Sequence, residues 1–246
     1  FFGPGRTPAH PGQDQPKQSA SALGSGFIID SEGYVVTNNH VIEDAEQVQV
    51  VLEDGTTLPA RIIGTDPRSD LAVLKVETDK ALPAVLFGNS DSVRVGEWVV
   101  AIGNPFGLGG TATAGIISAR GRDIQSGPYD DYLQIDAPIN KGNSGGPVFD
   151  TEGRVIGVNT AICSPNGGSV GIGFAIPASQ AKTAVQQIIE DGYVTRGWLG
   201  VQIQPVTEDI QASLGLEGTQ GALVSDVNKD SPAAKSGLEV TDVILA

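Results

Sequence analysis

The chain has 246 residues, and its 15 basic and 29 acidic side chains give a formal net charge of −14 at pH 7. This acidic balance repels polyphosphate and anionic lipid, which argues against nucleic acid or a polyanion as partner. The single cysteine, Cys163, excludes an intrachain disulfide, and no apolar run approaches the roughly 18 to 20 residues that span a bilayer.

Glycine and proline are the first indication of the fold class. The 33 glycines are nearly twice the usual share of about 7%, and with 15 prolines they predict many turns between short strands. The chain contains no methionine and no signal peptide. We therefore expect that its N-terminus arises by processing or trimming.

Along the chain, residues 1–22 are rich in Pro, Gly, Gln and Ser without any period, which predicts a flexible arm or loop. Two strand–turn–strand units follow, in "GSGFIIDSEGYVVTN" and "VQVVLEDGTTLPARIIG". Further apolar runs predict strands at 71–76, 97–103, 113–119, 132–136, 154–162 and 170–177. Short strands this frequent are typical of antiparallel barrels or a sandwich.

One helix is predicted at 177–193, with proline at its start and glycine near its end. A strand begins again in "TRGWLGVQI", which makes 190–196 a candidate linker. There is also a weak internal repeat at an offset of 120 positions, because 30–33 and 150–153 both read Asp-x-Glu-Gly. The repeat indicates two similar β-units, although this sequence is also a common hairpin turn.

Only two histidines are available for chemistry. His10 lies in the predicted arm, where nothing holds it against a partner. His40 ends the predicted strand "YVVTNNH", where a rigid element gives way to a turn. Taken alone, such a histidine is more often a satisfied surface or core residue than a general base.

A serine becomes a nucleophile when an imidazole accepts its proton and a carboxylate orients the imidazole. Asp70 is the candidate carboxylate, because it follows a polar turn and directly precedes the apolar run 71–76. The alternative is a turn carboxylate that caps its own backbone, which is how Asp66 reads.

The stretch "INKGNSGGPVFD" (139–150) places Ser144 among three glycines and an asparagine. Gly142 permits the unusual dihedrals that aim backbone N–H groups at a developing oxyanion, and the glycines after Ser144 leave room for substrate backbone. The alternative is a glycine-rich β-turn. The order His40, Asp70, Ser144 matches that of chymotrypsin-type triads.

Several segments together closely resemble the HtrA/Deg family of trypsin-like serine proteases, from about Gly24 to the end of the chain. They are "TNNHVI" (37–42), "SDLAVLKV" (69–76), "GNPFGLGGTATAGIISA" (103–119), "INKGNSGGPVFD" (139–150) and "GIGFAIP" (171–177). The resemblance implies that His40 is the general base, Asp70 its orienting carboxylate and Ser144 the nucleophile.

The same resemblance implies the remaining site residues. The N–H groups of Gly142, Asn143 and Ser144 would surround the oxyanion. The small apolar specificity pocket would fall near Ile139 and Ile162, which implies cleavage after aliphatic residues.

The fold implied is all-β. A chymotrypsin-like protease domain over 23–193 would consist of two perpendicular six-stranded barrels and a C-terminal helix, with the site in the cleft between the barrels. A family strand is missing before "FFG", so we expect the first barrel to lack one strand.

A partial PDZ domain is expected over 197–246, too short for a complete module. There Gly197, Trp198, Leu199 and Gly200 would form the loop that captures peptide C-termini. We therefore expect a fragment, truncated at both ends.

The function implied is an ATP-independent serine endopeptidase that degrades unfolded or misfolded polypeptides in protein quality control and the stress response. The resemblance also implies a periplasmic location and a homotrimer or higher oligomer. No cofactor or metal is expected, because two histidines and one cysteine do not supply a conventional metal site. The alternative is a chaperone or peptide-binding scaffold that holds unfolded chains without efficient cleavage.

Overall fold

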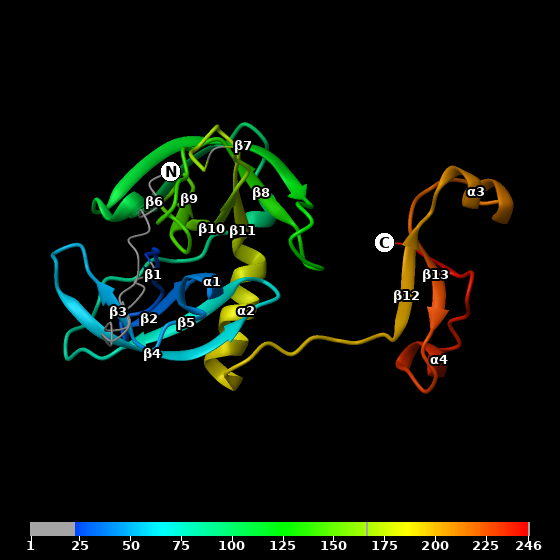
Figure 1. The fold of residues 1–246 in the computed structure, drawn as a ribbon, viewed down its shortest axis with the longest axis horizontal. Coiled ribbons are helices and arrows are strands. Elements are labelled where there is room, and N and C mark those ends of the chain that lie inside the picture. The colour runs from blue at the N-terminus through cyan, green and yellow to red at the C-terminus, as the bar shows by residue number, and fades with distance from the viewer. Residues whose placement is uncertain (1–22, 166, 246) are drawn as a thin grey trace, which may run out of the picture. The chain divides into compact units, whose positions relative to one another are not determined.

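A computed structural model describes residues 23–165 and 167–245. The predicted arm 1–22 lies outside the described residues. The chain divides into two compact units, with the boundary between Val194 and Thr195. The first unit contains two β-structures and the longest helix, and the second is a small mixed unit (Figure 1).

The first β-structure is a five-stranded antiparallel sheet in the order β1-β2-β5-β4-β3. Its strands are β1 (Phe27–Ile28), β2 (Tyr34–Thr37), β3 (Val48–Val51), β4 (Thr57–Asp66) and β5 (Leu71–Val76). The resemblance implied a six-stranded barrel that lacks one strand, and the described residues form five strands of this sheet. Because the ends of the sheet do not meet, the barrel is open, with β1 and β3 as its edges.

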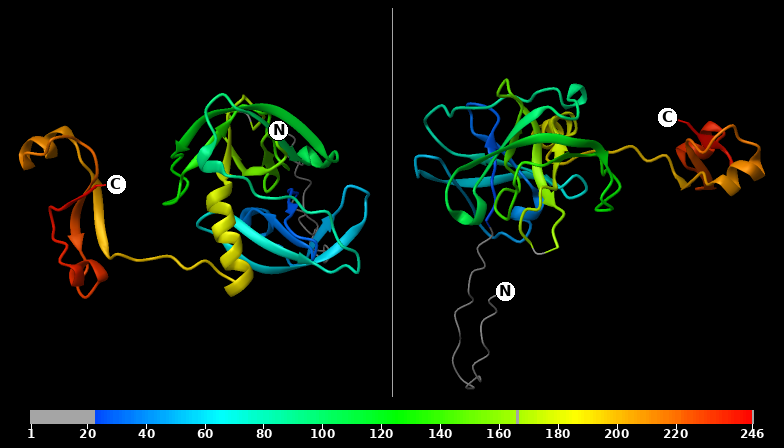
Figure 2. Two further views of the ribbon diagram at one scale, coloured as in Figure 1. Left: turned by 180° about the vertical axis from the view of Figure 1, so that it is seen from behind. Right: turned by 90° about the horizontal axis from the view of Figure 1, so that it is seen from above.

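The second β-structure is a closed barrel of six strands in the order β10-β11-β8-β7-β6-β9 (Figure 2). Its strands are β6 (Trp98–Gly103), β7 (Thr111–Arg122), β8 (Tyr132–Ile135), β9 (Pro147–Phe149), β10 (Val155–Ile162) and β11 (Gly173–Pro177). Alternate side chains fill its interior, among them Val99, Ile117 and Ile135. The predicted two-barrel, all-β fold is thus confirmed, with one barrel closed and one open.

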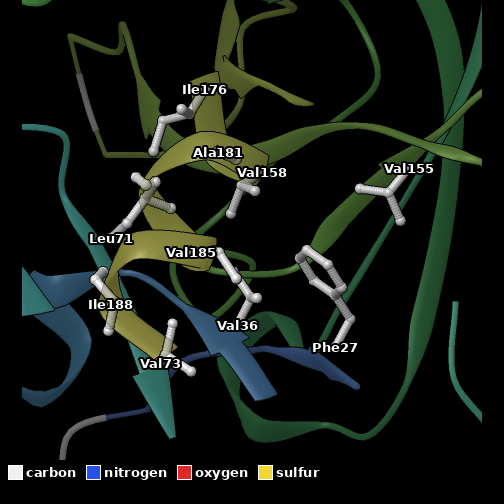
Figure 3. Close-up of a cluster of buried hydrophobic side chains, with 11 residues drawn as sticks. Phe27, Val36, Leu71, Val73, Val155, Val158, Ile176, Ala181, Val185 and Ile188 are labelled. Atoms are coloured by element: carbon white, nitrogen blue, oxygen red, sulfur yellow. The ribbon is translucent and has the colours of Figure 1, made fainter. Parts of the chain in front are cut away.

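Helix α2 (Ala178–Asp191) packs against β4 and β5 of the sheet and against β10 and β11 of the barrel. Its buried positions, such as Ala181, Val185 and Ile188, recur at the spacing of one helix face. They join side chains of both β-structures in one cluster, drawn in Figure 3. Gly192 ends the helix in a left-handed conformation with φ 86°, as the sequence predicted.

The start of α2 is capped by a residue from elsewhere in the chain. Pro177 precedes the helix and supplies no side-chain cap. Ser90, in the short 3₁₀ turn η1 (Ser90–Ser92), instead accepts a hydrogen bond from the backbone N–H of Ser179 at 3.0 Å. This bond attaches the helix to the connection that leads into the barrel.

The internal repeat corresponds to two hairpin turns of the same construction. Oδ1 of Asp30 accepts hydrogen bonds from the N–H groups of Glu32 and Gly33, each at 2.9 Å. Oδ1 of Asp150 likewise accepts from the N–H of Glu152 at 2.9 Å. The repeat therefore reflects one type of aspartate turn, used once in each β-structure.

The second unit contains a three-stranded antiparallel sheet in the order β12-β13-β14, with β12 at the edge. Its elements are β12 (Val201–Pro205), α3 (Glu208–Leu214), β13 (Ala222–Val227), α4 (Pro232–Ser236) and β14 (Val243–Ile244). Across the described parts of both units, no helix has the length and hydrophobicity needed to cross a membrane.

Candidate active site

His40 is not at the end of a strand, which corrects the sequence prediction. β2 ends at Thr37, and His40 is the second residue of the short helix α1 (Asn39–Ile42). The chain leaves the sheet because two asparagines bind the backbone carbonyl of Asp70. The donors are Nδ2 of Asn38 at 2.8 Å and the N–H of Asn39 at 3.1 Å. These bonds place the helix beside the turn that carries Asp70.

Asp70 directly precedes β5, as predicted, and that strand is almost entirely buried. Its backbone is left-handed with φ 55°, an uncommon conformation that aspartate tolerates better than most residues. Oδ2 of Asp70 lies 2.7 Å from Nδ1 of His40, and Oδ1 accepts the backbone N–H of His40 at 3.0 Å. Asp66, read from sequence as a turn residue, is the buried last residue of β4.

Thr160 in β10 completes the surroundings of this carboxylate, and nothing in its local sequence pattern singles it out. Its hydroxyl donates to Oδ2 of Asp70 at 2.6 Å. The carboxylate therefore receives three hydrogen bonds and can hold the Nδ1 proton of His40, which leaves Nε2 as an acceptor. Hydrogen bonding to Asp70 raises the pKa of His40 above its ordinary value, despite the opposing effect of burial.

Ser144 is half-buried in the loop before β9, and the two residues that follow it are hydrogen-bonded to Asn159 of β10. The N–H of Gly145 donates to the carbonyl of Asn159 at 2.7 Å, and the N–H of Asn159 donates to the carbonyl of Gly146 at 2.9 Å. The Ser144 hydroxyl itself donates to the carbonyl of Thr160 at 3.4 Å. Among the described residues, the Ser144 hydroxyl has this one acceptor and makes no hydrogen bond to His40.

The three backbone N–H groups expected around an oxyanion are not equivalent. The N–H of Asn143 donates to the carbonyl of Asn140 at 3.0 Å, so the turn already uses it. The N–H groups of Gly142 and Ser144 have no hydrogen-bond acceptor in the described part of the chain. Sequence reasoning could not separate the three, because the distinction depends on how the turn closes.

The direction of the Gly142 N–H follows from the peptide bond that precedes it. The carbonyl of Lys141 accepts the N–H of Phe106 at 2.9 Å. In a trans peptide the carbonyl and the next N–H point in opposite directions, so the Gly142 N–H points away from Phe106. Gly142 adopts φ 100°, and a Cβ there would lie 2.3 Å from the carbonyl oxygen of Asn104. Glycine is therefore required at this position.

A cavity of about 190 Å³ opens beside the Ser144 hydroxyl, and its walls are mostly apolar. Ile139 and Ile162, the two residues predicted for a specificity pocket, both line it together with Ala161. Ile139 is 3% exposed and supports one wall from the core of the barrel. The cavity is therefore suited to a small aliphatic side chain.

The predicted carboxylate-binding loop of the second unit immediately precedes its edge strand β12. Trp198 and Leu199 are exposed, at 62% and 44%. Gly200 has φ 80°, and a Cβ there would lie 2.3 Å from Cβ of Ser231. The carbonyl of Leu199 accepts the N–H of Ala233 at 2.9 Å, which ties the loop to α4. Gly197 is exposed at its start.

The described residues include no group of three or more His, Cys, Asp or Glu side chains arranged to hold a metal ion. Cys163 is a free, exposed thiol.

Comparison with known proteins agrees with this architecture. Residues 24–158 match the family described as trypsin-like peptidase domain, and residues 186–246 match the PDZ domain. A Brucella suis protein named "probable periplasmic serine endoprotease DegP-like" is 62% identical over 237 residues, which cover 96% of this chain and 45% of that protein. A Chlamydia trachomatis protein of the same name is 52% identical over 247 residues, which cover 100% of this chain and 49% of that protein. The chain spans about half the length of these relatives.

Solved structures give the same result. The HtrA-type protease AlgW with decapeptide superposes with a TM-score of 0.83 at 48% identity, covering 98% of this chain and 78% of that one. The serine endoprotease from Yersinia pestis superposes with a TM-score of 0.69 at 38% identity, covering 92% of this chain and 73% of that one. The chain therefore belongs to the HtrA-type family of trypsin-like serine proteases, with a PDZ region after the protease fold.

Proposed function

We propose that this chain hydrolyses peptide bonds through an acyl-enzyme formed on Ser144. The carrying observation is that one carboxylate, that of Asp70, orients His40 beside the loop that presents Ser144. Oγ of Ser144 attacks the substrate carbonyl while Nε2 of His40 takes its proton. The imidazolium then gives that proton to the departing amine, and water releases the acyl group by the same steps in reverse.

Transition-state stabilisation comes from two backbone donors, the N–H groups of Gly142 and Ser144. Both are free to bind the oxygen that becomes negatively charged, whereas the N–H of Asn143 closes a turn. Losing one such donor typically costs about 2.7–4 kcal/mol of barrier lowering.

We further propose that cleavage follows small aliphatic residues, such as valine or alanine. The support is the cavity beside Ser144, whose apolar walls include Ile139 and Ile162. A basic substrate side chain would need a carboxylate in the wall of the cavity, and the charged residue that lines it, Lys141, has the opposite sign.

The wider function that we propose is ATP-independent degradation of unfolded or misfolded polypeptides in an extracytoplasmic, periplasmic compartment. Relatives named periplasmic serine endoproteases support it. Functional limits of 23–193 for the protease part and 197–246 for the PDZ part fit the division of the chain after Val194. A homotrimer or higher oligomer, and capture of peptide C-termini at Gly197–Gly200, belong to the same proposal.

The test is reaction with a fluorophosphonate probe followed by mass mapping, with Ser144→Ala as control. We expect labelling of Ser144 and cleavage, without ATP, of a reduced and alkylated protein but not of its disulfide-intact form. A folded chain that neither labels nor cleaves would contradict the proposal.

A chaperone-like scaffold is the second candidate, and one observation favours it. The Ser144 hydroxyl donates to Thr160 and not to His40, so the nucleophile is not engaged with its base. Catalytic hydrogen bonds are, however, often long or misaligned before substrate binds. Suppression of aggregation by both the parent chain and Ser144→Ala, without cleavage by the parent, would support the scaffold.

A further inference from the structure

Ser25, in the segment before β1, uses all of its polar groups within the active-site region. Its N–H donates to the carbonyl of Ser144 at 2.8 Å, and its hydroxyl donates to the carbonyl of Gly142 at 2.6 Å. The same hydroxyl accepts the N–H of Asn104 at 2.8 Å, and the Ser25 carbonyl accepts the hydroxyl of Thr37 at 2.7 Å. One residue thus connects its own segment to three others: the loop 142–144, the segment of Asn104 and the end of β2.

The bond to Gly142 has a direct geometrical consequence. A residue's orientation is set by its two flanking peptide planes. The plane before Gly142 is held at the carbonyl of Lys141 by Phe106. The plane after it is held at the carbonyl of Gly142 by the Ser25 hydroxyl, and at the N–H of Asn143 by the turn. The Gly142 N–H lies in the first plane, and the second plane shares the Cα atom of Gly142 with it, so the bond from Ser25 limits how far the residue can rotate about that Cα.

Ser25 also links this loop to the half of the site that carries His40. Its carbonyl receives the hydroxyl of Thr37, the last residue of β2, three positions before His40. The contact is close, because a Cβ on Gly145 would lie 2.3 Å from the Ser25 carbonyl oxygen and 2.4 Å from Oγ1 of Thr37. The nucleophile loop and the end of β2 therefore meet at Ser25.

We propose that Ser25 is a positioning residue of the oxyanion site, which it serves without touching substrate. Its hydroxyl holds the Gly142 carbonyl so that the neighbouring Gly142 N–H faces the developing negative charge. This inference rests on the proposed protease function. Without the hydroxyl, the Gly142 carbonyl and the Asn104 N–H both lose a partner, and the peptide after Gly142 is held only through the N–H of Asn143.

The test compares Ser25→Ala, Ser25→Thr and Ser25→Cys with the parent chain on a peptide that has valine before the scissile bond. We expect Ser25→Ala to lower kcat by about 10- to 100-fold, less than complete loss of an oxyanion donor, with KM little changed. Ser25→Thr keeps the hydroxyl and should restore most of kcat. Ser92→Ala serves as the control, because it removes a hydroxyl that donates to the carbonyl of Asn89, in a turn that contributes no residue to the site.

Two inhibitors separate positioning from general destabilisation. A peptide aldehyde forms a hemiacetal with Ser144 whose oxygen occupies the oxyanion site, whereas the matching peptide alcohol binds without that bond. Ser25→Ala should weaken the aldehyde by about the same factor as kcat and leave the alcohol unchanged. Equal weakening of both, or an unchanged kcat, would overturn the proposal.

The result also distinguishes the two levels of inference. If the parent chain is active and Ser25→Ala equals it, only the role of Ser25 is wrong. If the parent is folded but inert to fluorophosphonate, the protease function fails and the role of Ser25 falls with it. Should Ser25→Ala not fold, Ser25→Cys keeps the size with a weaker donor, and an unchanged kcat there would count against the role of the hydroxyl.

Discussion

Oγ1 of Thr160 lies 2.6 Å from Oδ2 of Asp70, although the two residues are 90 positions apart in the chain. The same carboxylate oxygen lies 2.7 Å from Nδ1 of His40. Thr160 belongs to the barrel and Asp70 to the turn between β4 and β5 of the open sheet, so this bond joins the two β-structures at the carboxylate that orients the base.

We expect Thr160→Val to lower kcat/KM by about 10- to 100-fold, because a hydrogen bond to a charged group is worth about 1.5–3 kcal/mol. Valine has nearly the same shape as threonine but cannot donate to Asp70. Thr160→Ser retains the hydroxyl and is the matched control. Equal losses in the two variants would show that packing, and not the hydrogen bond, accounts for the effect.

The pH dependence of activity should follow His40. Its pKa is raised above 6.5 by the hydrogen bond to Asp70, and the neutral ring is the active base. Activity is therefore expected to fall as pH decreases through this raised pKa, and the acid limb of kcat/KM should lie above 6.5. A rate that stays flat from about pH 5 to 8 would reject His40 as the base.

The raised pKa of His40 affects stability in the opposite direction to activity, because the protonated ring stabilises the fold while the neutral ring is the active base. Since folding raises the pKa of His40, its contribution to the free energy of unfolding is fully present below the unfolded value and is lost as pH rises through the folded value. His40→Gln should remove this component of the pH dependence of Tm, which thermal scans of both proteins would show.

Gly142→Ala should abolish most activity, by about 100- to 1,000-fold, because the new Cβ would press on the Asn104 carbonyl and displace the Gly142 N–H. Gly96→Ala is a close control, since Gly96 has φ 93° and open space around its Cβ position. It should cost only about 1–2 kcal/mol of stability. Similar kinetics for the two variants would contradict a role of Gly142 in the oxyanion site.

Ile162→Ala should enlarge the cavity beside Ser144 and change its selectivity. We expect kcat/KM for valine before the scissile bond to fall by about tenfold or more, and the ratio of phenylalanine to valine cleavage to rise. Val170→Ala shortens a nearby exposed side chain that does not line the cavity, so it should leave the ratio unchanged. Competition between the two peptides in one reaction measures the ratio directly.

Much of the fold could be predicted from sequence, because strand periodicity and turn chemistry are local. The run 71–76 coincides with β5, and the predicted helix 177–193 contains α2. His40 was placed wrongly because the backbone carbonyl of Asp70, about 30 positions away, decides where β2 ends by accepting hydrogen bonds from Asn38 and Asn39. The local sequence pattern around His40 cannot predict hydrogen bonds to a residue so far away in the chain.

In the candidate site, too, the residues set by local sequence could be predicted and those set by distant contacts could not. Ser144 and Asp70 stand next to recognisable turns and strands, so their positions were readable. Thr160 and Ser25 were missed because their partners are far away in the sequence. Thr160 lies in an apolar run that predicts an ordinary strand, and its partner Asp70 is 90 positions away. The partner of Ser25, Gly142, is 117 positions away in a glycine-rich turn. Only the paired sheets bring these partners together.

The cluster drawn in Figure 3 has a consequence for how the protease part responds to heat. Its eleven buried side chains come from the open sheet, the barrel and α2, so no one of the three can separate without exposing the others to water. Melting of residues 23–194 should therefore be a single cooperative transition. We therefore expect no populated half-melted form that keeps Ser144 but releases His40, and activity and structure should disappear at the same temperature.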